Sequence, residues 1–148
     1  MKKSLYLVLF EVVFVSGCMS ADGPSFEQLR SENRQNLMKL SIGMTKQEVM
    51  TIMGDKTGYI KNYLGRRDAE WPTASNPYRS AILQGKEKTF EVLYYYTETK
   101  KTLYNTWGQY QGIADDELTP LVFDEDKLIG WGREFLEQNI QKYEIRLR

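Results

Sequence analysis

Residues 89–97 show the most regular alternation of side-chain character along the chain. A strand directs successive side chains to opposite faces, which places Phe90, Val92, Tyr94 and Tyr96 on one face. Glu91, Leu93, Tyr95 and Thr97 then lie on the other face. The β-branched and aromatic content favours a strand. We predict that the face with Phe90 and Tyr94 builds the core.

Further strands are indicated on both sides of this segment. Residues 118–123 and 127–131 are largely apolar and flank the acidic stretch 124–126, which is typical of a β-hairpin. The Gly130-Trp131-Gly132 motif is interpreted as a strand end that allows close packing. Residues 58–64 alternate in part and predict a first strand. Residues 65–86 are interpreted as an insertion.

The N-terminal half carries the start signal of a helix at Ser25. A serine caps a helix by accepting a backbone N–H bond, and Gln28 stands at the capping-box position three residues later. Phe26, Leu29, Leu37 and Leu40 recur near helical spacing. We therefore predict a helix from Phe26 onward.

A second, shorter helix is predicted after Thr45. Thr45 and Glu48 form a capping box, and Met44 and Val49 have the spacing of a hydrophobic staple. Gly54 is placed for a left-handed conformation at the end of the helix. A tight turn at Gly43 would lead into it.

Residues 134–143 predict a last helix, with Phe135, Ile140 and Tyr143 loosely periodic. The sequence thus predicts an α+β fold. Two short N-terminal helices pack on a small antiparallel sheet of about three to four strands, with a helix at the C-terminus.

Residues 1–17 have the composition of an export signal. Two lysines precede a mostly apolar stretch that is too short for an ordinary membrane-spanning helix. The stretch ends Val15-Ser16-Gly17-Cys18, which resembles the lipobox of bacterial lipoproteins. The resemblance implies lipidation of Cys18, a lipidated tether over residues 18–25 and a single domain over 26–148. Two or more acyl chains would anchor such a domain stably.

Two further segments resemble the BamE-like (SmpA/OmlA) family of small lipoproteins. Residues 40–54 contain Gly43-Met44-Thr45, then Val49, Ile52 and Gly54, and residues 121–132 contain an apolar strand, an acidic turn and Gly-Trp-Gly. The resemblance implies two short helices on a three-stranded antiparallel sheet and a role in outer-membrane barrel assembly. The insertion at 65–86 and a long C-terminal tail depart from the family pattern.

Composition restricts the chemistry available to the chain. It has no histidine and one cysteine, so histidine-based catalysis, histidine metal sites and an internal disulfide within the chain are excluded. The whole chain is neutral, and removal of the signal leaves a net charge of −1, which argues against a nucleic-acid binder. We predict no catalytic residue, no cofactor and no metal site.

Two acidic clusters and one aromatic stretch are the remaining candidates. The clusters 115–117 and 124–126 are interpreted as solvated turns, with a calcium site or acid–base work on a glycan as the alternatives. Tyr104, Trp107 and Tyr110 lie in a polar, non-periodic stretch. We predict that these three aromatic residues belong to a partner-binding surface.

The sequence therefore predicts a non-enzymatic, lipid-anchored module that binds another envelope protein. The residue after Cys18 is Met19, not the aspartate of inner-membrane retention, which by resemblance implies the periplasmic face of the outer membrane, with the inner membrane as the alternative. Two other functions stay open. One is a carboxylate enzyme acting on cell-wall glycan, and the other is an inhibitor domain, since a two-helix-on-sheet design resembles β-lactamase-inhibitor proteins.

Overall fold

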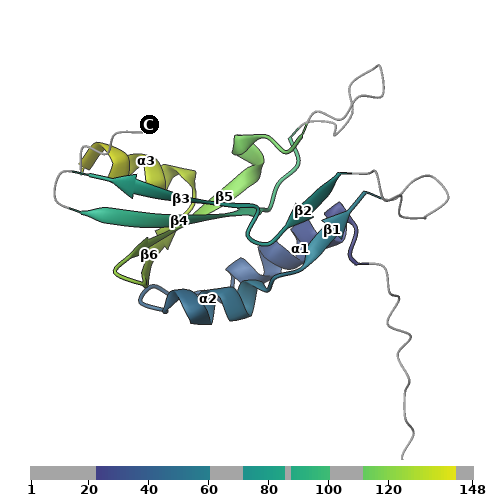
Figure 1. Cartoon of the computed structure of the whole chain (residues 1–148), viewed down its shortest axis with the longest axis horizontal. Helices are drawn as coiled ribbons and strands as arrows, with labels where there is room; N and C mark the ends of the chain where they lie inside the picture. The colour runs from purple at the N-terminus through teal and green to yellow at the C-terminus, as the bar shows by residue number, and fades with distance from the viewer. Residues whose placement is uncertain (1–22, 61–71, 86–87, 101–111, 143–148) are drawn as a thin grey trace, which may run out of the picture.

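A computed structural model describes residues 23–60, 72–85, 88–100 and 112–142 of the chain (Figure 1). It begins with two helices and ends with a third. The elements in order are α1 (Phe26–Leu37), α2 (Lys46–Met53), β1 (Thr57–Tyr59), β2 (Thr73–Ser75), β3 (Arg79–Gln84), β4 (Thr89–Tyr96), the short 3-10 helix η1 (Asp115–Glu117), β5 (Leu118–Asp124), β6 (Lys127–Trp131) and α3 (Arg133–Lys142).

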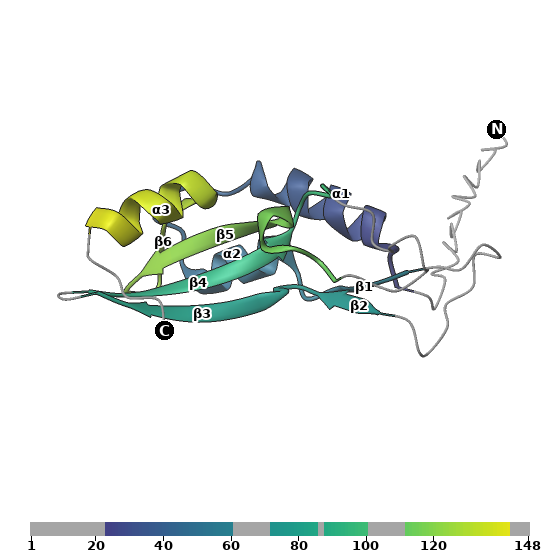
Figure 2. The same ribbon diagram turned by 90° about the horizontal axis from the view of Figure 1, so that it is seen from above.

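The strands form two antiparallel sheets. The larger sheet has the order β3-β4-β5-β6, so neighbours in sequence are neighbours in space, and β1 pairs with β2 in a smaller sheet. The helices α1 and α3 lie over opposite ends of the molecule (Figures 1 and 2). The predicted α+β fold, with its two N-terminal helices and its C-terminal helix, is confirmed.

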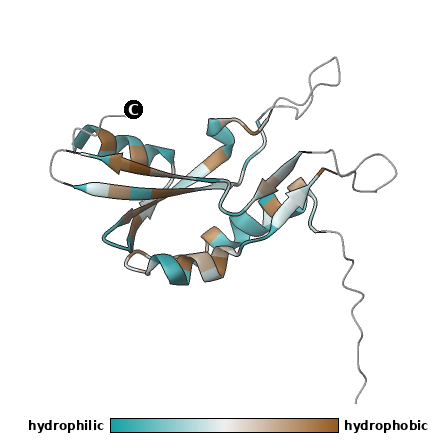
Figure 3. Cartoon of the chain, in the orientation of Figure 1, coloured by the Kyte–Doolittle hydropathy of each residue, from teal (hydrophilic) through white to brown (hydrophobic). Residues whose placement is uncertain are grey.

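Helices cover the larger sheet on both faces. On one face, Val49 and Met53 of α2 pack against Leu93 and Tyr95 of β4. On the other face, Leu136 of α3 joins a second cluster that contains Phe90 and Val92. In Figure 3, brown apolar segments lie along the strands of the larger sheet and alternate with teal polar segments on the helices.

The prediction for β4 was therefore only half right. Phe90, Val92 and Tyr96 are buried as expected, but Tyr94 is half-buried, and Tyr95 on the supposedly outer face is fully buried. The error has a physical reason, because a strand that is covered on both faces buries both sets of alternating residues. Alternation identified the strand but not the number of layers.

The predicted capping signals of α1 and α2 are confirmed. Ser25 and Gln28 form the capping box of α1, and Thr45 and Glu48 form that of α2, where the Thr45 N–H donates to Glu48 Oε2 at 2.7 Å. Gly54 ends α2 with φ 72° and ψ 175°. The predicted left-handed helical conformation of Gly54 was therefore wrong, because this ψ lies in another part of conformational space, which is also essentially restricted to glycine.

The turn into α2 closes one edge of the larger sheet. Gly43 has a φ of 90°, and its N–H donates to the carbonyl of Leu128 at 2.8 Å. The N–H of Leu128 in turn donates to the carbonyl of Met44 at 2.8 Å. Thr45 and Lys127 form an isolated antiparallel β-bridge. The two segments that resemble the BamE-like family are thus hydrogen-bonded to each other along β6.

The predicted hairpin 118–131 is confirmed as β5 and β6. Its two-residue turn consists of Glu125 and Asp126, which both have positive φ, as a tight hairpin turn requires. Gly130 faces α3, where a Cβ atom would come within 2.6 Å of the Phe135 ring. The interpretation of this glycine as a close-packing position is therefore confirmed.

Residues 65–86, interpreted as an insertion, contain the strands β2 and β3, which were not predicted from the sequence. These two short strands are continuous with the sheets, and a cis peptide bond between Asn76 and Pro77 connects them. The predicted first strand at 58–64 is observed as β1, Thr57–Tyr59, and residues 61–64 lie outside the described residues. The predicted last helix is confirmed as α3.

Candidate functional site

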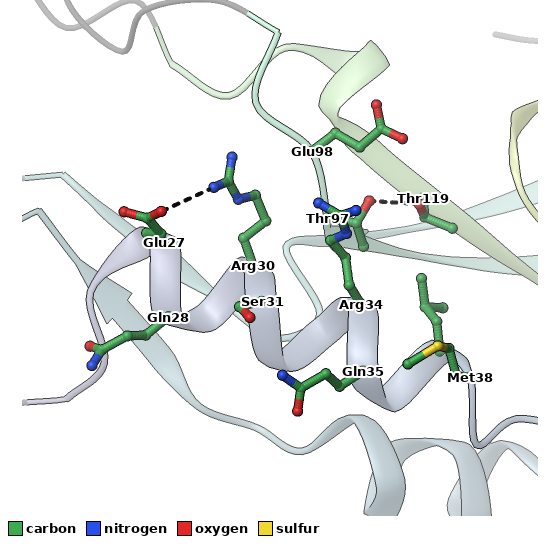
Figure 4. Close-up of a pocket in the computed structure, with 11 residues that line it drawn as sticks. Glu27, Gln28, Arg30, Ser31, Arg34, Gln35, Met38, Thr97, Glu98 and Thr119 are labelled. Atoms are coloured by element: carbon green, nitrogen blue, oxygen red, sulfur yellow. Dashed lines mark hydrogen bonds and ion pairs between the residues drawn. The ribbon is translucent and has the colours of Figure 1, made fainter.

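A groove of about 780 Å³ runs along the outer face of α1 (Figure 4). One wall is the helix itself, and the other consists of the two residues that directly follow β4 and one residue of β5. The lining residues are Glu27, Gln28, Arg30, Ser31, Arg34, Gln35, Leu37, Met38, Thr97, Glu98 and Thr119. Most of them are exposed side chains, so the groove is an open surface and not an enclosed ligand cavity.

The periodicity of α1 explains why this face is polar. Phe26, Leu29 and Asn33 point inward and are buried, and the edge of the Phe26 ring packs against the ring of Tyr96, with centroids 6.0 Å apart. The polar residues between these positions project outward at helical spacing. The helix therefore presents two guanidinium groups, from Arg30 and Arg34, one turn apart.

A buried amide pair fixes α1 against the rest of the domain. Asn33 Nδ2 donates to Asn76 Oδ1 at 3.0 Å, and Asn76 Nδ2 donates to Asn33 Oδ1 at 2.6 Å. Asn33 Nδ2 also donates to the Tyr96 carbonyl at 2.8 Å, and Asn76 Nδ2 donates to the Met53 carbonyl at 3.1 Å. One polar cluster thus connects both N-terminal helices with β4.

The wall opposite α1 is held by hydroxyl groups. Thr97 Oγ1 and Thr119 Oγ1 share a hydrogen bond of 2.7 Å, and Figure 4 shows Arg34 rising from α1 toward Thr97. Glu98 follows Thr97 and lies in the same wall. Guanidinium, carboxylate and hydroxyl groups therefore line one continuous surface.

The two arginines of the groove differ in their ion pairing. Arg30 Nη2 lies 3.6 Å from Glu27 Oε1. Such a long, solvent-exposed ion pair contributes little to stability. Within the described part of the chain, no carboxylate pairs with Arg34. Met38, the residue directly after α1, is 81% exposed and adds an apolar side chain to the groove lining.

The prediction that residues 115–117 form a solvated turn was wrong for Glu117, which is 1% exposed. Its Oε1 accepts the Lys100 N–H at 2.7 Å, and its Oε2 accepts the Ala114 N–H at 2.8 Å. The Glu117 carbonyl also accepts the N–H groups of Thr97 and Glu98, each at 3.1 Å. This carboxylate therefore positions the backbone on both sides of residues 101–111 and supports the wall of the groove.

The site residues that the sequence predicted cannot be placed against this groove. Tyr104, Trp107 and Tyr110 lie outside the described residues, and so does Cys18. The residues that form the groove were not predicted. The signal available was the polar outer face of α1, which is shared by most surface helices.

A second, smaller cavity of about 280 Å³ lies between α3 and β3. The guanidinium carbon of Arg79 sits 4.3 Å from the centre of the Tyr94 ring, and Arg79 pairs with Asp115 at 3.0 Å. The guanidinium of Arg133 donates to the Asp115 carbonyl. The Tyr94 ring therefore lies near the surface, covered by an exposed cation and not by the core, and it is half-buried.

Comparison with known proteins identifies a family. The chain matches DUF3192, a family of proteins of unknown function, over residues 11–138. The chain belongs to the DUF3192 family. The match to DUF3192 includes the segment around Cys18, both N-terminal helices, both sheets and most of α3. No curated protein and no solved structure matches the chain.

Among the described residues, no helix is both long enough and apolar enough to cross a membrane. No group of three or more cysteine, aspartate or glutamate side chains there is arranged to hold a metal ion.

Proposed function

We propose that this protein is a bacterial lipoprotein, anchored through Cys18 at the periplasmic face of the outer membrane, that binds another envelope protein without catalysing a reaction. The anchor rests on the resemblance of Val15-Ser16-Gly17-Cys18 to a lipobox, and the observation that carries the binding role is the α1 groove. Arginine and methionine are enriched at protein interfaces, and arginine frequently dominates the binding energy. Arg34 and Met38 offer both side chains at one end of an open surface.

The groove favours a polypeptide partner over a small molecule. Its lining alternates charged, amide and apolar groups along a helix of three turns, which suits a surface with similarly distributed groups. Glycan hydrolysis, the alternative, calls for a general acid whose pKa is raised by burial. The carboxylates of the groove are those of Glu27, 84% exposed, and Glu98, 57% exposed, and neither is sheltered in this way.

The start of the domain supports a position close to the membrane. Gly23 abuts the Tyr59 ring, and the Tyr59 N–H donates to the Pro24 carbonyl at 2.9 Å. Residues 23–25, expected to be tether, are therefore fixed on β1. Five Cα–Cα steps separate Cys18 from Gly23, which limits this distance to about 18 Å. A lipid on Cys18 would hold the first turn of α1 within about 30 Å of the membrane surface.

Substitution of the cysteine tests the anchor. Cys18→Ser removes the proposed acylation site, so it should abolish labelling by a fatty-acid analogue and release the protein from the membrane fraction. A Ser16→Thr variant of the same chain, which keeps the thiol, serves as the matched control. Lipid labelling that persists in Cys18→Ser would refute the anchor.

Photocrosslinking in living cells tests the groove independently. A benzophenone side chain at Gln35, in the groove, should give a discrete adduct whose second component is identified by mass spectrometry as an envelope protein. The same side chain at Gln138, on the outer surface of α3, is the control position and should give no such adduct. Addition of Arg34→Glu should reduce the Gln35 adduct at least about tenfold.

The design separates a specific site from general proximity. Lys39→Glu changes the same charge just beyond α1, outside the groove lining, and should leave the Gln35 adduct unchanged. Equal adducts at Gln35 and Gln138, or loss of the adduct with Lys39→Glu as well as Arg34→Glu, would contradict docking in the groove. The absence of any adduct at Gln35 would contradict it too.

We extend the proposal to assembly or maintenance of the outer membrane, on the resemblance of residues 40–54 and 121–132 to the BamE-like family. The hydrogen bonds between Gly43, Met44 and Leu128 support it, because they make these two segments one structural unit. Deletion of the gene should lower the folded fraction of outer-membrane barrels, measured by heat-modifiable mobility. An unchanged folded fraction would argue against this role and leave the binding proposal standing.

A further inference from the structure

The two edges of the larger sheet differ in how they are protected. The edge at β6 is closed by the turn into α2, through the reciprocal bonds of Leu128 with Gly43 and Met44, each 2.8 Å long. The edge at β3 carries no such cover, since none of the described segments hydrogen-bonds to its outer side. The fold thus closes one edge and leaves the other available.

The hydrogen-bond alternation of β3 shows which groups face outward. The Gly85 N–H donates to the Lys88 carbonyl at 2.8 Å. These two residues, just beyond the ends of β3 and β4, are therefore a hydrogen-bonded pair of the β3–β4 ladder. Alternation along an antiparallel ladder then directs the backbone groups of Ser80, Ile82 and Gln84 away from β4. These donors and acceptors form a template for another strand.

The side chains of the same three residues are exposed. Ile82, in the middle of the strand, is 69% exposed. Natural edge strands usually block pairing with a lysine, a proline or a bulge near their centre. β3 has an apolar side chain at that place, and its single charged residue, Arg79, stands at its first position.

We infer that a second copy of this chain pairs with β3, strand against strand and antiparallel, to form one continuous sheet across a two-fold axis. The axis passes between Ile82 and Ile82 of the second copy. Ala81 then lies opposite the second copy's Leu83, and Ser80 lies opposite its Gln84. Each pair shares one face of the sheet, as antiparallel pairing requires, and Ile82 supplies an apolar contact to itself.

The charges near the axis fit a second copy. Arg79 falls opposite Gly85 of the other chain, so no like charges face each other along the strand. The cross-strand neighbour of Ile82 on β4 is Glu91, whose carboxylate is already paired with Lys46 at 2.9 Å. Ile82 at the axis is uncharged and its acidic neighbour is paired with a lysine, so like charges do not meet there in two identical chains.

Co-expression of two differently tagged full-length chains tests this inference. Capture of one tag in mild detergent should recover the other tag. Ile82→Glu in both copies, or Ile82→Lys in both copies, places like charges on the axis and should reduce recovery at least about tenfold. Ile82→Glu in one copy with Ile82→Lys in the other should restore recovery, because opposite charges then meet.

Controls separate this contact from others. Ile42 is 72% exposed and lies between α1 and α2, so Ile42→Glu and Ile42→Lys are matched substitutions that should leave recovery unchanged. Circular dichroism melting of each variant establishes that it is folded. No recovery between wild-type copies would overturn the inference. Recovery that the charged substitutions of Ile82 leave unchanged, or that the Ile42 substitutions reduce equally, would overturn the inference as well. None of these outcomes depends on the α1 groove or on Cys18.

Discussion

Neighbouring tyrosines on β4 should respond very differently to truncation. Tyr95 is fully buried beneath α2, in the cluster with Leu93, Val49 and Met53, whereas Tyr94 is half-buried under the guanidinium of Arg79. The hydrophobic pattern alone ranks them in the opposite order. Tyr95→Ala and Tyr94→Ala therefore compare the two-layer expectation with the three-layer structure directly.

The structure sets the size of the difference. Truncation of a fully buried large aromatic residue removes its transfer free energy and leaves a cavity, which costs about 3–5 kcal/mol. Tyr94→Ala removes only the transfer free energy of a half-buried ring and one exposed cation–π contact. That contact is worth about 0.5–1 kcal/mol. We expect Tyr94→Ala to cost about 1–2 kcal/mol in all.

Urea unfolding followed by far-UV circular dichroism measures both costs on the same chain. Tyr95→Ala should lower the transition midpoint markedly, and Tyr94→Ala should lower it slightly with the same slope. An equal or larger effect of Tyr94→Ala would refute the packing of α2 over this face of β4. Arg79→Ala is the matched control, since it should resemble Tyr94→Ala and leave the Tyr95 cluster intact.

The hydroxyl of Tyr95 gives the same side chain a second signature. It is buried without a hydrogen-bond partner among the described residues, and desolvation raises the pKa of Tyr95 to about 12. Because the folded pKa exceeds the unfolded value near 10, the folded state loses stability as the pH rises from about 10 to about 12, by roughly 2–3 kcal/mol. Tyr95→Phe should abolish this alkaline loss and be neutral or stabilising at pH 7. A clear destabilisation at pH 7 would show that the hydroxyl is satisfied.

Three further predictions concern the N-terminal half. Gly54→Ala should lower the free energy of unfolding in urea by about 1–3 kcal/mol, because its φ of 72° and ψ of 175° suit only glycine. The space around Gly54 is open, so no steric clash adds to this cost. An unchanged free energy of unfolding would show that α2 ends elsewhere. Asn33→Ala should cost about 1–3 kcal/mol by leaving Asn76 and the Tyr96 carbonyl unpaired, and addition of Asn76→Ala should add less than its own single effect; full additivity would contradict the pair. The backbone N–H and the hydroxyl of Thr45 lower the pKa of Glu48 below 4.5, so its contribution to stability is present above that pH and is lost as the pH falls through the lowered value. Glu48→Gln should therefore flatten the acid limb of a melting-temperature profile, and an unchanged limb would argue against the capping box.

The features that could be predicted from the sequence are those encoded within a few residues. Both capping boxes, at Ser25 and Thr45, and the hairpin turn at 124–127 are confirmed because their partners lie three residues or fewer apart. The strand β4 was recognised from its alternation. Its environment was not, since the number of covering layers depends on where α3 returns.

The interactions that were missed join residues distant in sequence. Asn33 and Asn76 are 43 residues apart, and each reads as an ordinary surface amide. Glu117 sits in an acidic triplet that a solvated turn explains equally well, yet its carboxylate accepts two backbone N–H groups. Burial of a polar residue depends on partners that only the folded chain brings together, so composition gives no hint of it.

The candidate site depends on these missed interactions. Arg34 follows Asn33 directly, so the helix turns one side chain into the core and the next into the groove. The bond from Asn33 to the Tyr96 carbonyl fixes the distance between α1 and the end of β4, where Thr97 and Glu98 form the opposite wall. Glu117 holds that wall from behind through the N–H of Lys100 and its own carbonyl. A rigid groove of polar side chains thus rests on two buried polar groups, which explains why a helix face that looks merely solvated in the sequence becomes a preorganised surface in the fold.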